Sequence, residues 1–168
     1  MTGSEITLTQ MLARREARSR QQQTFLQTHR SPLVSFSMNI PGPIKTNPQI
    51  RKAFMLGRNL LFRQLNDAGA QILADSEIHE DTGDELLLAV GNIEPSKLKD
   101  IAVQIEEISP FGRLYDIDVL DAEGQKLSRP NFRKCLICDK QAQDCARSRT
   151  HSVKEMQNAI DILLEVII

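Results

Sequence analysis

Two aspartates, Asp116 and Asp118, have the residue type and spacing best suited to chemistry in this chain. They lie in the run 112–119, which is otherwise mostly apolar and is predicted to form a buried strand. Side chains on a strand alternate between its two faces, so the two carboxylates point the same way. Adjacent carboxylates repel each other and lose hydration unless a positive group lies between them. Both are therefore predicted ligands of a hard divalent cation, usually Mg²⁺, and a pair of solvated acids on a strand edge is the alternative.

A second group of residues with ligand chemistry lies nearer the C-terminal end. Cys135, Cys138, Cys145 and His151 follow the spacing C-x2-C-x6-C-x5-H. Four such ligands in one short segment suit a tetrahedral structural Zn²⁺ site, and a segment with little core of its own would gain stability from the metal. In the alternative interpretation the cysteines are small buried hydrophobes and His151 caps the last helix.

Length and composition indicate a single globular domain. The chain has 168 residues, and we expect a core over about 32–128, with the Cys/His knuckle and a terminal helix over about 130–168. The net charge of −1, the absence of Trp and the single Tyr argue against nucleic acid and anionic membranes as partners. No apolar run is long enough to span a bilayer, and residues 1–12 lack the pattern of a secretory signal. We therefore expect a cytoplasmic protein whose cysteines remain thiols or metal ligands.

The elements that must position these residues can be predicted from periodicity and turn chemistry. The pair Asn47-Pro48 is a clear helix start, with Asn47 as the N-cap. The predicted elements are a helix over 8–27 capped by Thr7 or Thr9, a strand over 32–40, a helix over 48–67, strands over 70–79 and 85–90 joined by a turn at 81–84, a helix over 95–108, the strand with the aspartates, a short extra strand at 125–128, and a last helix over 152–168. The core order β-α-β-β-α-β predicts an α+β fold of the ferredoxin-like type, with two helices on one face of an antiparallel sheet.

Arginines in the first predicted helix have two interpretations. Arg14, Arg15, Arg18 and Arg20 form either a solvated face or a surface that binds a phosphate or an acidic partner.

Several short motifs, taken in order, resemble one family. The motifs are Pro41-Gly-Pro-Ile-Lys45, Gly112-Arg-Leu-Tyr-Asp-Ile-Asp-Val-Leu120, Ser128-Arg129, Cys135-x-x-Cys138 and Cys145-Ala-Arg-Ser-x-x-His151. Together they resemble the apo-citrate lyase phosphoribosyl-dephospho-CoA transferases, the holo-acyl-carrier-protein synthases of citrate lyase. The resemblance covers about residues 32–151.

The resemblance implies a nucleotidyl-type transfer. The donor would be 2′-(5″-triphosphoribosyl)-3′-dephospho-CoA, and the acceptor a serine hydroxyl of the apo acyl carrier protein subunit of citrate lyase. A phosphodiester would form and diphosphate would leave. Mg²⁺ and positive side chains would take up the charge that such a reaction develops.

The resemblance and the local chemistry together suggest roles for the charged residues. Asp116 and Asp118 would hold Mg²⁺, and either could also accept the proton of the serine. Arg113 would face the leaving diphosphate. The phosphate-binding candidates are Lys45 after its Pro-Gly-Pro turn, and Arg129, Arg147 and Arg149.

One departure keeps other interpretations open. The Gly-Ser pair that common nucleotidyltransferases place about ten residues before their acidic pair is missing here, where residues 106–108 read Glu-Glu-Ile. The Arg-x-x-Asp-x-Asp run on a β-α-β-β-α-β core is also similar to that of the hydroxymethylpterin pyrophosphokinases, an analogy of fold. The alternatives are therefore a pyrophosphokinase-like, Mg²⁺-dependent transferase for a small molecule, and a non-catalytic zinc-knuckle binding module.

Overall fold

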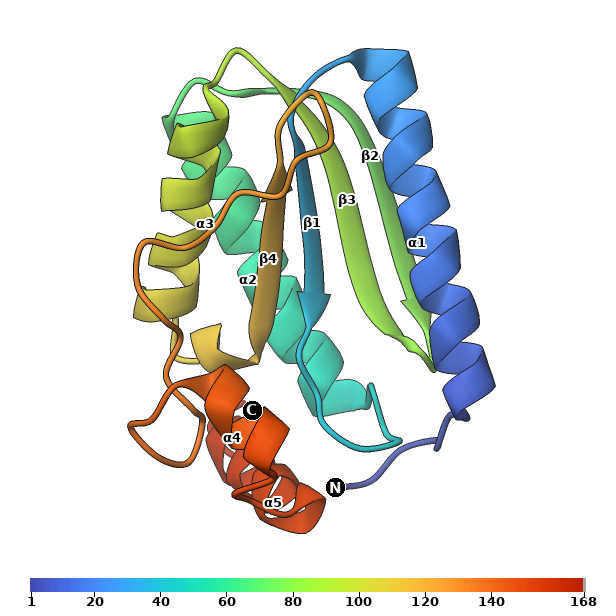
Figure 1. The fold of residues 1–168 in the computed structure, drawn as a ribbon, viewed down its shortest axis with the longest axis vertical. Coiled ribbons are helices and arrows are strands. Elements are labelled where there is room, and N and C mark those ends of the chain that lie inside the picture. The colour runs from blue at the N-terminus through green and yellow to red at the C-terminus, as the bar shows by residue number, and fades with distance from the viewer. Residues whose placement is uncertain (168) are drawn as a thin grey trace.

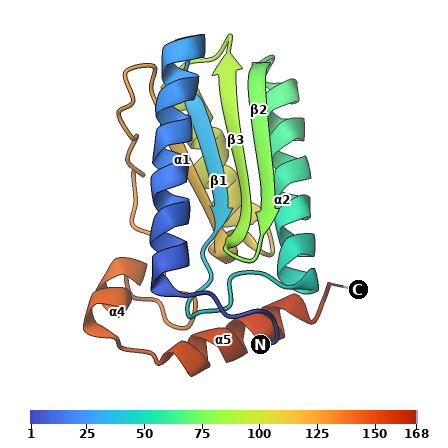
Figure 2. The ribbon, with the colours of Figure 1, turned by 90° about the vertical axis from the view of Figure 1, so that its right-hand side faces the viewer.

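A four-stranded antiparallel sheet forms the centre of the computed structural model, which describes residues 1–167. The elements are α1 (Leu8–His29), β1 (Leu33–Met38), α2 (Pro48–Asp67), β2 (Gln71–Glu80), β3 (Gly83–Gly91), α3 (Pro95–Ile108), the 3₁₀ turn η1 (Gly112–Leu114), β4 (Tyr115–Leu120), α4 (Ala142–Ser148) and α5 (Val153–Leu164). The strand order is β2-β3-β1-β4. Helices α2 and α3 cover one face of the sheet, and α1 lies across the other (Figures 1 and 2). The predicted ferredoxin-like core is confirmed, with α1 as an addition on the open face.

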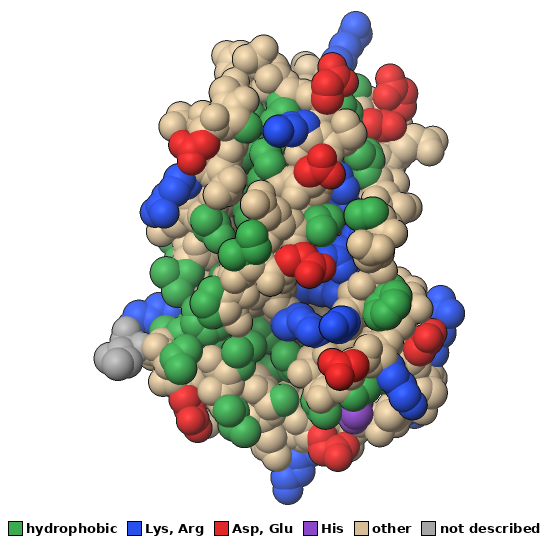
Figure 3. All heavy atoms as spheres, turned by 90° about the vertical axis from the view of Figure 1, so that its left-hand side faces the viewer, with side chains coloured by type: hydrophobic (Ala, Val, Ile, Leu, Met, Phe, Trp, Pro, Cys, Tyr) green, Lys and Arg blue, Asp and Glu red, His purple; other side chains and the backbone are tan. Residues whose placement is uncertain are grey.

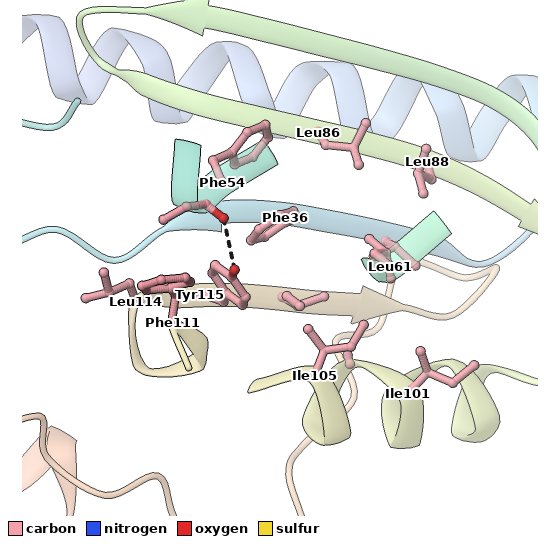
Figure 4. Packing of buried hydrophobic residues seen from close by; sticks show 14 of the residues in the cluster. Phe36, Phe54, Leu61, Leu86, Leu88, Ile101, Ile105, Phe111, Leu114 and Tyr115 are labelled. Carbon is pink, nitrogen blue, oxygen red and sulfur yellow. Dashed lines mark hydrogen bonds between the residues drawn. The ribbon is translucent and has the colours of Figure 1, made fainter. Parts of the chain in front are cut away.

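The main core lies between the sheet and the pair α2 and α3 (Figure 4). Phe36 of β1 stacks on Phe54 of α2 with ring centroids 4.8 Å apart, and it meets the edge of Tyr115 of β4 at 5.2 Å. The Tyr115 hydroxyl donates a 2.9 Å hydrogen bond to the carbonyl of Ala53. Gly57 allows this packing, because a Cβ at that position would lie 2.6 Å from the Tyr115 ring. The strand that carries the aspartates is thus fixed by its neighbours on the apolar face.

Capping residues set the helix boundaries as the sequence predicts. The Asn47 side chain accepts a hydrogen bond from the Ile50 backbone N–H, and α2 begins at Pro48. Helix α3 has the predicted bounds 95–108. Of the two cap candidates for α1, Thr7 is the N-cap, in a capping box with Gln10.

Three local predictions are wrong, and one helix was missed. Residues 112–114 form a 3₁₀ turn before β4 instead of the start of a strand. The expected strand at 125–128 is reduced to a single bridge between Leu120 and Lys126. The β2–β3 hairpin is tighter than expected, since β3 already begins at Gly83. Within the knuckle region, the short helix α4 was not predicted.

The C-terminal part of the chain lies below the end of the sheet where β1 ends and β4 begins (Figure 1). Its last helix, α5, begins after the N-cap Ser152 and ends at Leu164, four residues short of the predicted end at Ile168, which lies outside the described residues. The chain start lies beside it, and the Met1 amino group forms a 2.7 Å ion pair with Asp161. Within residues 1–167, no helix combines the length and hydropathy needed to cross a membrane.

Candidate functional site

Asp116 and Asp118 point to the face of the sheet that α1 covers. Their partners across the ladder on β1 are Ser37 and Ser35, whose side chains share that face. Both aspartates line a cavity of about 660 Å³ along the outer edge of β4. Its other walls are α3, the returning segment 126–133 and the start of α4. The prediction that the two carboxylates share one face is confirmed, and that face opens on a cavity of a size common for ligand sites.

Two side chains of α3 bind the backbone of Ile117, the residue of β4 that lies between the two aspartates. The Ile117 backbone N–H donates a 2.9 Å hydrogen bond to Glu106, and the Lys99 ammonium donates a 3.4 Å bond to the Ile117 carbonyl. These contacts satisfy backbone groups that an edge strand would otherwise leave unpaired. Burial raises the pKa of Glu106 and lowers the pKa of Lys99, and the opposite charge of each partly offsets the effect on the other. Helix α3 therefore fixes the position of the acidic pair.

Cationic side chains surround the acidic pair. Those that line the cavity are Lys99, Lys126, Arg129 and Arg133. Lys126 forms a 2.9 Å ion pair with Asp118, and Arg129 lies 3.4 Å from the Glu106 carboxylate. Figure 3 shows Lys and Arg side chains gathered between the sheet-and-helix body and the C-terminal part of the chain. The cavity thus combines three carboxylates, those of Asp116, Asp118 and Glu106, with four cationic side chains.

The two aspartates have different electrostatic surroundings. Burial, together with the charge of Asp118, raises the pKa of Asp116, while Arg133, Lys126 and Arg18 partly offset this rise. Lys126 instead pairs with Asp118, and this hydrogen bond raises the pKa of Lys126. Asp116 is consequently the carboxylate whose negative charge is least compensated.

This donor set fits a hard divalent cation. The Asp116 carboxylate accepts no hydrogen bond and forms no close ion pair with residues 1–167, although it is half-buried. A second carboxylate lies on the same strand face, and its partner, Lys126, is 62% exposed and free to move aside. Oxygen ligands of this kind are those that Mg²⁺ prefers, and a cation would relieve the repulsion between the two acids.

Asp116 also lines a second, smaller cavity of about 120 Å³ under α1. Lys45 lies in its wall, as do Arg15 and Arg18 of α1. The Lys45 ammonium donates a 2.7 Å hydrogen bond to the carbonyl of Ile40. The predicted phosphate-binding candidate Lys45 is therefore brought next to the acidic pair.

Three predicted site residues lie elsewhere. Arg113 is turned toward the knuckle, where it donates hydrogen bonds to the carbonyls of Lys134 and Cys135, at 2.5 and 2.6 Å. Arg149 lines another cavity, of about 530 Å³, beside the knuckle, and Arg147 is exposed on α4. Of the predicted phosphate-binding residues, only Lys45 and Arg129 line the cavities that contain Asp116.

The predicted zinc ligands converge as a compact cluster. The sulfur atoms of Cys135, Cys138 and Cys145 and a ring nitrogen of His151 all lie within 4.8 Å of one another. Cys138 Sγ is 3.5 Å from Cys145 Sγ and 3.4 Å from His151 Nε2. In a tetrahedral site with Zn–S bonds of about 2.3 Å, sulfur atoms lie about 3.8 Å apart. The cluster can therefore bind a metal ion, and the helix cap is Ser152 rather than His151.

The knuckle also supports the segment that closes the large cavity. A small antiparallel bridge joins Lys134 to Gln141, and the Ala142 N–H donates a 2.8 Å hydrogen bond to the Arg133 carbonyl. The Arg133 guanidinium in turn donates a 2.6 Å bond to the carbonyl of Gly112, just before β4. The knuckle thus holds Arg133 beside the acidic pair.

Sequence reasoning missed four side chains of the large cavity, which are Lys99, Glu106, Lys126 and Arg133. A signal existed for two of them. Lys99 and Glu106 are seven residues apart on α3 and therefore lie on one helix face, next to the apolar stripe that packs on the sheet. Charged residues in such a position have to find partners in the interior.

The fold and the cavities define a class of site: an α+β core that presents paired carboxylates, surrounded by cations, to a cavity. Comparison with known proteins gives the family. The family model "Apo-citrate lyase phosphoribosyl-dephospho-CoA transferase" matches residues 6–166. A Vibrio cholerae protein named "Probable apo-citrate lyase phosphoribosyl-dephospho-CoA transferase" is 36% identical over 160 residues, which are 93% of this chain and 90% of the relative. Proteins with the same name, without the qualifier, from Citrobacter koseri and Escherichia coli O1:K1 / APEC are 34% and 35% identical, over 97% and 95% of this chain and 91% and 88% of their own lengths. The chain belongs to the apo-citrate lyase phosphoribosyl-dephospho-CoA transferase family, as its ordered motifs predicted.

Proposed function

We propose that this enzyme transfers the phosphoribosyl-dephospho-CoA group from 2′-(5″-triphosphoribosyl)-3′-dephospho-CoA to a serine of the apo acyl carrier protein subunit of citrate lyase. The serine oxygen forms a bond to the α-phosphorus of the donor, the bond to the β-phosphate breaks, and diphosphate leaves. One observation carries the proposal: within a chain of this family, the paired carboxylates of β4 share a cavity with four cationic side chains.

The acidic pair is the proposed Mg²⁺ site. Mg²⁺ would neutralise charge on the triphosphate and on the departing diphosphate. Asp116, which has no close partner among residues 1–167, and Asp118, whose partner is exposed, supply the carboxylate oxygens. Glu106 and Lys99 keep both in place through the backbone of Ile117.

Positive side chains position the donor in this proposal. Arg129 and Arg133, on the segment that closes the large cavity, are placed to contact its phosphates. Arg113 has a supporting function, because its guanidinium is bound to the carbonyls of Lys134 and Cys135. Arg147 and Arg149 lie outside both cavities that contain Asp116, so we propose no contact between them and the reacting phosphates.

The family match favours this reaction over the two alternatives. It extends over residues 6–166 and so includes both the acidic pair and the knuckle, which makes a separate zinc-knuckle module unnecessary. The likeness to a pyrophosphokinase is limited to the order of the core elements and the acidic pair.

Mass spectrometry of the carrier protein tests the proposal. Apo carrier protein incubated with enzyme, donor and Mg²⁺ should gain the mass of the phosphoribosyl-dephospho-CoA group on one serine. The Asp116→Asn and Asp118→Asn variants should fail to produce this gain, whereas Asp100→Asn, which removes an exposed acid of α3, should match the wild type. Full modification by both active-site variants would contradict the assignment of the acidic pair.

We further propose that the Cys/His cluster binds one structural Zn²⁺ and that the enzyme acts in the cytoplasm. The ligand set and the close approach of its atoms support zinc. Elemental analysis of the purified protein should find about one equivalent of zinc, and Cys138→Ser should lose it. A zinc content below about a tenth of an equivalent after purification without chelators would contradict the assignment of the Cys/His cluster as a zinc site.

A further inference from the structure

We propose that the small cavity under α1 is the subsite for the diphosphate leaving group, and that Arg15 and Lys45 bind it. This assignment rests on the proposed function and adds the N-terminal helix to the active site. The helix lies outside the motifs that identified the family by sequence, which begin at Pro41. Its Met11, Arg15 and Arg18 nevertheless line the cavity.

The two cavities meet at Asp116. This residue and Asn39 line both the cavity of about 660 Å³ and the cavity of about 120 Å³. A donor whose reacting phosphorus lies beside Asp116 can therefore extend in two directions. The large space has the size of a typical ligand pocket, whereas the small one falls below that range and suits a small anion. The nucleotide portion accordingly occupies the large cavity and the two departing phosphates the small one.

The other acids of the small cavity are already neutralised. Glu85 accepts hydrogen bonds from Arg14 at 3.1 Å and from Arg18 at 2.6 Å. Asp84 is fully buried and interacts with three side chains, which are Thr46, Arg51 and His79. Neither carboxylate is available to neutralise a further cation.

Arg15 and Lys45 remain without an acidic partner. Within residues 1–167, the Arg15 guanidinium has no hydrogen bond and no ion pair, and Lys45 contacts only the carbonyl of Ile40. The two cations are close enough for the Arg15 charge to contribute, after burial, to lowering the pKa of Lys45. A polyanion between them would remove this repulsion and form charge-assisted hydrogen bonds with both.

The position also fits the bond changes of the reaction. As the serine oxygen bonds to the α-phosphorus, the bond between that phosphorus and its bridging oxygen to the β-phosphate breaks. The electron pair goes to the diphosphate, and the serine proton goes to a base or to solvent. Negative charge therefore grows on the leaving group, and a guanidinium and an ammonium beside it stabilise the transition state.

Calorimetric titration of the full-length protein with inorganic diphosphate tests the subsite. The buffer contains no added divalent cation and no chelator, so that Mg²⁺ does not contribute and the Cys/His cluster keeps its metal. The wild type should bind diphosphate, and Arg15→Gln and Lys45→Gln should each raise the Kd about tenfold or more, as expected for loss of a charge-assisted contact. The matched control is Arg20→Gln on the same helix, because Arg20 lines neither cavity that contains Asp116 and its side chain pairs only with the exposed Glu16. This control should bind as the wild type does.

Two results would overturn the assignment. One is a wild type that binds no diphosphate at millimolar concentration, and the other is an Arg15→Gln variant with an unchanged Kd. Thermal melts that match for Arg15→Gln and Arg20→Gln show that the helix remains intact. Because the titration needs neither donor nor carrier protein, it separates this assignment from the proposed function. If diphosphate binding depends on Arg15 but the carrier protein is never modified, the diphosphate subsite is supported and the proposed transfer reaction is contradicted.

Discussion

The two faces of the sheet differ sharply although the same strands build both. On the face under α2 and α3, β1 and β4 present Val34, Phe36, Tyr115, Ile117 and Val119, all at most 1% exposed. On the face under α1, the alternate positions are the polar Ser35, Ser37, Asp116 and Asp118, with the apolar pair Leu33 and Leu120 at one end. Helix α2 buries six residues against the sheet, whereas α1 has 22 residues and buries none completely.

This difference explains how a small domain can hold a charged site. Tight packing on one face fixes the strands, and the period of two along each strand then places the polar side chains at defined positions on the other. Helix α1 covers that other face with Arg and Gln side chains, for example Gln22, which donates to Ser35, and Arg18, which pairs with Glu85. Phe25 and Leu26 of α1 pack on a small apolar cluster of Leu33, Leu87 and Ala89, and the rest of the cover leaves polar cavities.

Asp116→Asn, a change on the polar face, should have the largest effect on activity and almost no effect on stability. Asp116 would hold the cation that neutralises the triphosphate. Loss of its carboxylate is therefore expected to lower kcat by on the order of 10³-fold. Stability should stay equal or rise, because the native Asp116 carboxylate is half-buried, lies beside a second acid and has no close partner of its own among residues 1–167. Carrier modification rates and thermal melts measure the two effects. A variant with more than a tenth of wild-type activity would contradict the prediction.

Phe36→Ala, a change on the apolar face, should strongly destabilise the fold. Phe36 is fully buried and contacts both Phe54 and Tyr115, so its removal leaves a cavity and should lower the free energy of unfolding by about 3–5 kcal/mol. Urea denaturation followed by circular dichroism gives the value. Phe36→Leu is the control and should lose clearly less. A loss below about 1 kcal/mol for the alanine variant would show that this face does not carry the stability of the fold.

Local sequence signals predicted the elements that depend on local chemistry. Asn47 and Pro48 mark the start of α2 because the cap and the fixed proline backbone are short-range effects. The alternation around Asp116 likewise predicted a shared face. The 3₁₀ turn before β4 depends on how tightly the chain turns at the end of α3, since a Cβ at Gly112 would lie 2.0 Å from the Glu106 carbonyl oxygen. Neither the periodicity of α3 nor that of β4 predicts such a tight turn.

The candidate site was predictable only where its members lie on one element. Asp116 and Asp118 share a strand, and the knuckle ligands share one short segment, so spacing identified both groups. The cations come from α1, α3 and the returning segment, whose meeting depends on the packed fold. Arg113 illustrates the limit, because its neighbours in sequence gave no hint that it would turn toward the carbonyls of Lys134 and Cys135.

Tyr115→Phe should weaken the apolar face without opening a cavity. The variant keeps the ring but loses the 2.9 Å hydrogen bond to the Ala53 carbonyl, which joins β4 to α2. Burial raises the pKa of Tyr115, so the hydroxyl stays protonated as the donor up to strongly alkaline pH. The expected loss is about 1–1.5 kcal/mol in chemical denaturation, with activity nearly unchanged. A large loss of activity with normal stability would instead place the hydroxyl in the reaction.

Ser35→Ala should have the smallest effect and sharpens the comparison, because Ser35 is the immediate neighbour of Phe36 on β1. Its hydroxyl accepts a 3.2 Å hydrogen bond from Gln22 of α1, a single neutral contact worth about 0.5–1 kcal/mol. A double-mutant cycle with Gln22→Ala isolates this term, since the two side chains contact each other directly. A coupling energy of a few tenths of a kcal/mol would mean that α1 is held mainly by its other contacts, such as its ion pairs with Glu85 and the packing of Phe25 and Leu26. If the predicted values hold, Ser35 and Phe36, adjacent residues of one strand, differ several-fold in their contribution to stability, as their opposite faces predict. A loss of stability from Ser35→Ala as large as that from Phe36→Ala would show that the polar face also stabilises the fold.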